Sequence, residues 1–173
     1  MNRPVHLMLA ALALAAGVLA AAVENPQPPL RDDEVAAIDL AIWIRDQRAG
    51  LLVLDTRAVA AAEERIAGSQ SLALLDGGLP PADLVVVYAD AQIGDAAFAA
   101  LRQRYPGLPL RRLRGGIEAW NSEVLFPVLR DDAPMHVQRA FAPRADLSRY
   151  FGGAPQRGVP DVRTLHQRSR RGC

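Results

Sequence analysis

Residues 83–120 read DLVVVYADAQIGDAAFAALRQRYPGLPLRRLRGGIEAW, a pattern that predicts a strand, a helix and a second strand in one βαβ unit. The first strand, residues 84–88, is apolar throughout, as expected of a strand covered on both faces. The second strand, residues 110–113, leads to a pair of glycines. Ligands of parallel sheets bind just beyond the carboxyl ends of the strands, where helix N-termini offer unpaired N–H groups. The loop after Tyr88 is therefore the first place to expect a binding or catalytic site.

The residues before this unit continue the alternation of strands and helices. We expect a short strand at residues 34–38, a helix at 40–47 capped by Asp39, and a buried strand at 51–54. An alanine- and glutamate-rich helix at 58–65, a third strand at 71–75 and a turn at 76–83 should follow. Alternation of this kind is typical of an α/β domain with a central parallel sheet flanked by helices.

The N-terminus has the pattern of a secretory signal peptide. Arg3 precedes an uncharged run rich in alanine and leucine, and small residues at Ala20 and Ala22 suit a cleavage site. We therefore expect residues 1–22 to be removed and the mature protein to be periplasmic, with no membrane span. An uncleaved membrane anchor is the alternative, although the alanine content makes the run a weak span. Residues 23–33 are rich in proline and predict an extended linker.

Composition restricts the function further. The remaining chain, of about 150 residues, fits one domain by size. A formal net charge of +1 argues against a nucleic-acid-binding protein. His136 and His166 lack neighbours at metal-ligand spacing, so we expect no metal site, and we expect no cofactor. The sole cysteine, Cys173, cannot form an internal disulfide, so its thiol is free, reactive or joined to another molecule.

The C-terminal residues divide into a helical extension and a basic tail. Residues 129–153 contain a polar, helix-prone stretch in which Pro143 should cause an interruption or a kink. Gly152 and Gly153 suit the end of that helix. Residues 154–173 carry five arginines against one aspartate and have few apolar side chains. Such a composition predicts a disordered tail.

Four segments occur in an order and at separations typical of one family. They are LVLDTR at residues 52–57, RIAGS at 65–69, VVVY at 85–88 and LRGGIEAW at 113–120. Together they resemble the successive signatures of a rhodanese-like domain, which would cover residues 34–128. The resemblance implies a compact α/β domain with a central parallel sheet flanked by helices. It also implies that the active-site loop of the family corresponds to the loop after Tyr88.

The loop departs from the family at the position that carries the chemistry. Active rhodaneses hold a persulfide on a cysteine directly after this strand, and Ala89 occupies that position here. No serine or threonine in the loop replaces the cysteine, and the phosphatase relatives also need a loop cysteine together with an arginine. The resemblance therefore implies a ligand-binding loop without sulfurtransferase activity, composed of Ala89, Asp90, Ala91, Gln92, Ile93 and Gly94.

Structural roles are expected for five residues near this loop. Asp55 ends a buried strand, where its carboxylate can cap the following turn with Arg57 as its ionic partner. We favour this role over direct catalysis. Gly115 and Gly116 belong to the LRGGIEAW segment, and Trp120 suits packing in the core.

Two classes of function follow from the sequence. The missing loop cysteine favours a non-enzymatic module that binds a protein partner in the cell envelope, or a small ligand. The position of Cys173 favours a sulfur or redox carrier, because Arg168, Arg170 and Arg171 lie close by and stabilise a thiolate. A dimer linked through Cys173 is a further alternative.

Overall fold

The computed structural model describes residues 28–58, 64–75 and 78–158. The chain divides into two compact units, Met1–Leu30 and Arg31–Cys173, and the fold described below lies in the second. The predicted signal peptide, most of the helix predicted at residues 58–65, and Cys173 fall outside the described residues. None of the described helices combines the length and the apolar character that crossing a membrane requires.

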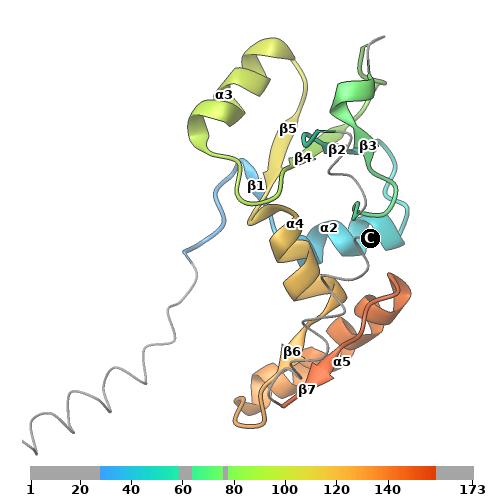
Figure 1. Ribbon diagram of the computed structural model, residues 1–173, viewed down its shortest axis with the longest axis vertical. Helices are drawn as coiled ribbons and strands as arrows, with labels where there is room; N and C mark the ends of the chain where they lie inside the picture. Colours follow the sequence, from blue (N-terminus) through green and yellow to red (C-terminus); the bar gives the residue numbers. More distant parts are fainter. Residues whose placement is uncertain (1–27, 59–63, 76–77, 159–173) are drawn as a thin grey trace, which may run out of the picture. The chain divides into compact units, whose positions relative to one another are not determined.

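A sheet of five parallel strands forms the centre of the second unit, in the order β1-β5-β4-β2-β3 (Figure 1). The strands are β1 (Glu34–Val35), β2 (Leu51–Asp55), β3 (Gln70–Ser71), β4 (Leu84–Tyr88) and β5 (Leu110–Leu113). β4 lies in the middle and is buried at every position, as its apolar sequence predicts. Asp55 pairs with Tyr88, and Val87 pairs with Arg112. Asp55, Tyr88 and Arg112 therefore all lie at or near the carboxyl ends of their strands.

In the described part of the chain, four helices flank this sheet. They are α2 (Ala37–Arg45), α3 (Asp95–Arg104), α4 (Gly116–Ala119), which continues into the π-helix η3 (Trp120–Leu125), and α5 (Met135–Tyr150). Alternate side chains of a strand face opposite sides of the sheet, and this produces two hydrophobic cores. The first core joins Val53 and Val86 to α2, α4, η3 and α5. The second core joins Leu52 and Val85 to Phe98 of α3.

Helix α2 begins earlier than the sequence predicts. Its N-cap is Ala36, so Asp39 lies in the first turn and the prediction that Asp39 caps the helix is wrong. The earlier start buries Ala37 in the first core together with Leu40. A carboxylate in the first turn still interacts favourably with the helix dipole.

The bounds predicted for the third strand, residues 71–75, are also wrong. β3 ends at Ser71, and the chain then forms the 3₁₀ helix η2 (Leu72–Leu74). Leu72 and Leu75 both pack on the second core. A strand would place these two side chains on opposite faces of the sheet, because they are three residues apart.

Helix α5 continues through Pro143, so the interruption expected there is wrong. Phe141 and Ala145 are buried with Leu129 in a small third core. This packing holds the helix on both sides of the proline, whose own side chain is exposed. The helix ends before Gly152, which adopts a left-handed conformation with φ of 74°, as the sequence predicts.

A second, two-stranded parallel sheet follows the main one. It consists of β6 (Val128–Leu129) and β7 (Gln156–Arg157), which α5 connects. β7 lies within the tail predicted to be disordered from residue 154, so that prediction is wrong for residues 154–158. Backbone hydrogen bonds order these residues: the Gln156 N–H donates to the Pro127 carbonyl (2.9 Å) and the Gly158 N–H to the Leu129 carbonyl (2.8 Å). Pairing of this kind needs few apolar side chains, so composition does not predict it.

Candidate functional site

Residues 89–94 connect β4 to α3 at the carboxyl edge of the sheet, and we call them the 89–94 loop. The side chains of Asp90, Ala91 and Gln92 are exposed to solvent. Ile93 is buried in the second core beside Phe98. The loop is therefore anchored near its C-terminal end and presents its middle residues to solvent.

The backbone of the α4 N-terminus lies directly against the loop. The Ile117 N–H donates to the Ala89 carbonyl (2.9 Å) and the Glu118 N–H to the Asp90 carbonyl (3.2 Å). A Cβ atom at Gly116 would lie 2.5 Å from the carbonyl oxygens of both Ala89 and Ala91. Gly116 also has a positive φ of 59°, so glycine is needed there for both space and conformation.

Asp55, Arg57, Ser69 and Tyr88 form a buried set of hydrogen bonds on one side of the loop, which we call the tyrosine cluster. Arg57 donates to the two carboxylate oxygens of Asp55 from Nε (2.9 Å) and Nη2 (2.8 Å). The Tyr88 hydroxyl donates to Oδ2 of Asp55 (3.0 Å) and lies 2.9 Å from Oγ of Ser69. The ion pair predicted between Asp55 and Arg57 is thus present.

Neither the carboxylate nor the phenol of this cluster titrates near neutral pH. Asp55 is 1% exposed. Burial acts to raise the pKa of its carboxyl, but the hydrogen bonds from Arg57 and Tyr88 hold that pKa below its usual value. Burial raises the pKa of the Tyr88 phenol. Asp55 therefore stays charged and Tyr88 keeps the proton that it donates.

Arg57 also connects the tyrosine cluster to the loop. Its Nη1 donates to the carboxylate of Asp90 (3.3 Å), and its Nη2 donates to the carbonyl oxygen of Glu64 (2.6 Å). The Arg57 side chain is almost fully buried, whereas that of Asp90 is mostly exposed. One arginine thus joins the end of β2 to the start of the loop.

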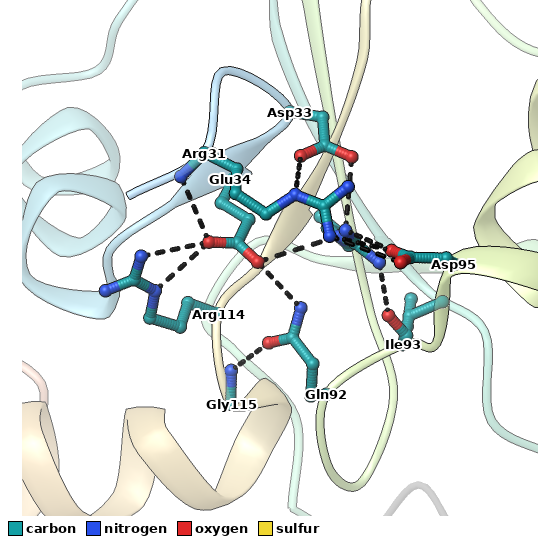
Figure 2. A network of polar contacts seen from close by, with 9 residues as sticks. Arg31, Asp33, Glu34, Gln92, Ile93, Asp95, Arg114 and Gly115 are labelled. Carbon is teal, nitrogen blue, oxygen red and sulfur yellow. Dashed lines mark hydrogen bonds and ion pairs between the residues drawn. The ribbon is translucent and has the colours of Figure 1, made fainter. Parts of the chain in front are cut away.

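Three arginines and three carboxylates lie on the other side of the loop (Figure 2). We call this set the arginine cluster: Arg31, Asp33, Glu34, Asp95, Arg112 and Arg114. Arg112 of β5 is 2% exposed and contacts Asp95 through Nη2 (2.6 Å) and Asp33 through the same nitrogen (3.2 Å). Its Nη1 donates to the carbonyl oxygen of Ile93 (2.7 Å). A buried arginine therefore holds both the end of the loop and the first turn of α3.

Gln92 connects the loop to the same cluster. Its side-chain oxygen accepts a hydrogen bond from the Gly115 N–H (2.6 Å), and its amide nitrogen donates to Glu34 (3.2 Å). Arg114 donates to the other oxygen of Glu34 from Nη2 (3.0 Å). Figure 2 shows Gln92 between Glu34 and Gly115.

Glu34 and Asp95 of the arginine cluster are ionised at neutral pH. Burial acts to raise the pKa of Glu34, but Arg114 and the other hydrogen-bond donors hold it below its usual value. The hydrogen bond from Arg112 and the charge of Arg31 lower the pKa of Asp95. The Nε of Arg112 is buried 3.9 Å from Glu34 and has no hydrogen-bond partner among the residues that the structure describes. Arg112 is thus held mainly through its two terminal nitrogens.

The 89–94 loop is therefore fixed from both sides. It contains no nucleophile, since Ala89 stands at its first position. Among the described residues, no hydrogen bond from the backbone N–H groups of residues 90–94 to other protein groups is present. These N–H groups and the exposed carboxylate of Asp90 are the groups that the loop can offer to a ligand.

No family model and no curated protein matches the chain. Three solved structures are similar over about half of it. A Bacillus halodurans protein is 26% identical with a TM-score of 0.43, over 51% of this chain and 70% of that one. A Lactobacillus plantarum protein is 25% identical with a TM-score of 0.42, over 51% of this chain and 82% of that one. A Rhodopseudomonas palustris protein of unknown function, described as a possible tyrosine phosphatase, is 19% identical with a TM-score of 0.41, over 56% of this chain and 93% of that one.

The structure brings together most of the residues that the sequence singles out. Asp55 and Arg57 border the 89–94 loop on one side, and Gly115 and Gly116 lie against it. Trp120 lies elsewhere: it is buried in the first core, with its ring centroid 5.1 Å from that of Phe151. The roles assigned to these residues stay predictions.

Arg112 and its partners are absent from the sequence prediction of the site. The sequence predicts an extended linker at residues 23–33, but Arg31 and Asp33 contact Asp95 and Arg112, so the prediction is wrong for these two residues. One signal was available in the sequence. The acidic stretch at residues 32–34 and the arginines in and directly after the strand predicted at 110–113 have opposite charges, and both lie in or beside predicted strands.

Proposed function

We propose that this chain is an exported rhodanese-like module that binds a protein partner in the cell envelope through the 89–94 loop and lacks sulfurtransferase activity. One observation carries the proposal: the loop has an alanine where the chemistry of such a domain would need a thiol, yet it is fixed in place by contacts from both sides. Fixing a loop that has no reactive group serves recognition, because a preorganised loop loses less conformational entropy on binding.

The exposed groups of the loop suit an extended protein segment. Backbone N–H groups at residues 90–94 can donate to carbonyl oxygens of such a segment, and Asp90 can accept hydrogen bonds from it. Asp90 remains mostly exposed although it also contacts Arg57. A carboxylate there disfavours inorganic anions, so thiosulfate and phosphate are poor ligands of this loop.

The proposal has two tests. Purified protein should produce no thiocyanate from thiosulfate and cyanide above a control without protein. In cells, a photo-crosslinking amino acid at Ala91 should capture a partner, whereas the same amino acid at Ala99, which is exposed on α3, should not. Thiocyanate production, or identical adducts from both positions, would contradict the proposal.

A sulfur or redox carrier is the second candidate function. It rests on the position of the sole thiol at Cys173, within a few residues of Arg168, Arg170 and Arg171. In such a step the thiolate attacks a terminal sulfur of a polysulfide, forms a new S–S bond and releases the shortened polysulfide. A persulfide on Cys173 after exposure to polysulfide, found by mass spectrometry, would favour this function. An unmodified thiol would argue against it and favour the binding module.

A further inference from the structure

A cavity of about 490 Å³ lies on the α3 side of the sheet. Thr56, at the end of β2, contributes to its lining. Leu72 and Leu75, from η2 and the residue after it, form an apolar wall, and Arg104 and Tyr105 line it from the C-terminal end of α3. Its volume falls within the range of about 300–1,000 Å³ typical of small-molecule sites.

The apolar wall belongs to the hydrophobic interior. Leu72, Leu75 and Tyr105 are each partly buried and pack against the second core. Their remaining exposed surface faces a cavity whose neighbouring side chains are fixed by that packing. An apolar group placed there would remove more of this surface from water, which is favourable by roughly 25 cal/mol per Å².

The polar groups of the cavity point to an anion. Arg104 is the sole charged residue among the described lining residues, and within the described part of the chain no carboxylate lies within ion-pair distance of it. Its guanidinium carbon lies 5.5 Å from the centre of the Tyr105 ring, which orients the planar fork. Such a fork matches a carboxylate, with which it forms two parallel hydrogen bonds.

The cavity is also connected to the 89–94 loop. The backbone N–H and the hydroxyl of Thr56 both donate to the carbonyl oxygen of Tyr88, each at 2.9 Å. Tyr88 is the residue directly before the loop. A ligand that contacts Thr56 therefore lies one hydrogen bond away from the start of the loop.

We propose that this cavity binds a small organic carboxylate with an apolar body, with the carboxylate on Arg104 and the apolar body against Leu72 and Leu75. The site is separate from the 89–94 loop and does not depend on the function proposed for that loop. Decanoate is a suitable probe, because it combines one carboxylate with an unbranched apolar chain, and decan-1-ol is its uncharged counterpart.

Isothermal titration calorimetry of decanoate with the full mature chain tests the proposal. We expect saturable binding at one site, weakened about tenfold by Arg104→Gln, since one charge-assisted hydrogen bond has about that effect. Arg102→Gln is the matched control, because Arg102 is exposed on the same helix and does not line the cavity. Ala73→Trp, at an exposed lining position, should abolish binding by filling the cavity.

Three results would overturn the proposal. If decanoate shows no saturable binding, or if Ala73→Trp leaves its affinity unchanged, the cavity is not its site. If decan-1-ol binds as tightly as decanoate and Arg104→Gln has no effect, the assigned ligand class is wrong. Circular dichroism of each variant checks that the fold is retained.

Discussion

The two clusters that fix the 89–94 loop do so by different physical means. The tyrosine cluster is compact, and its centre is buried: Asp55 is 1% exposed and is bonded to Arg57, two residues after it, and to Tyr88 of β4. Ser69, directly before β3, contacts the Tyr88 hydroxyl. The arginine cluster surrounds one buried residue, Arg112, with carboxylates that include Asp95, whose side chain is 70% exposed. A buried cluster depends on complete pairing, whereas an exposed one is weakened by salt and tolerates the loss of a member.

The largest effect is expected from Asp55→Ala, which breaks the tyrosine cluster. Arg57 would then lose its buried counter-ion and keep its contact with the exposed carboxylate of Asp90. Removing one partner of a buried ion pair destabilises a protein by about 3–5 kcal/mol. Urea denaturation of variant and wild type measures the loss. Asp46→Ala is a matched control, since Asp46 forms an exposed pair with Arg45, and it should leave the stability nearly unchanged. An Asp55→Ala protein as stable as the wild type would remove the distinction between the clusters.

A smaller loss is expected from Arg112→Met, which removes the centre of the arginine cluster. The exposed carboxylate of Asp95 can be hydrated once its partner is gone, and methionine can fill the space above Phe98, over whose ring the Arg112 guanidinium lies at 5.2 Å. The remaining loss comes from the Ile93 carbonyl, which is left without its donor at a cost of about 1–3 kcal/mol. If this variant were less stable than Asp55→Ala in urea denaturation, the ranking of the clusters would be reversed.

The response to acid sharpens the comparison. The folded-state pKa of Asp55 is depressed, so its ionised form stabilises the fold above the unfolded-state pKa of about 4. That contribution is lost as the pH falls through the lower folded-state pKa. Asp55→Asn should therefore flatten the fall of the unfolding free energy measured between neutral pH and acid. An unchanged slope would show that other carboxylates cause the acid sensitivity.

The smallest effect is expected from Arg31→Gln in the arginine cluster. Arg31 is 56% exposed, and its contact with Asp95 joins two exposed side chains. Pairs of this kind contribute little and are screened at about 1 M salt. The melting temperature of the variant should therefore be slightly lower than that of the wild type in dilute buffer and equal to it in concentrated NaCl, whereas the effect of Asp55→Asn should persist. A loss that salt does not diminish would mean that the contact is buried more deeply than its exposure indicates.

The same contrast explains how much of the molecule the sequence predicts. The strands of the main sheet, the 89–94 loop and the pairing of Asp55 with Arg57 follow from short-range patterns: apolar runs, turn residues and charges two positions apart. The arginine cluster joins residues near 31–34 to residues 95, 112 and 114. No local pattern shows which of several arginines will be buried, so Arg112 was missed although its segment was predicted to be a strand.

The remaining errors also have local causes that the sequence does not show. The start of α2 is decided by the burial of Ala37, and the end of β3 by the packing of Leu72 and Leu75 on one core. Both depend on which face of the sheet receives each side chain. The order at residues 154–158 depends on a backbone partner, β6, which lies before α5 in the chain.

The position of β1 has a consequence for the time at which the domain can fold. β1 forms one edge of the sheet, and its partner is β5, where Glu34 pairs with Arg112 and Val35 with Leu113. If the chain is exported, as we propose, and crosses the membrane with its N-terminus first, β1 enters the new compartment before its partner. Until β5 arrives, neither the sheet edge nor the arginine cluster can form, and such non-local pairing slows folding. Closure of this edge would then wait for the arrival of β5.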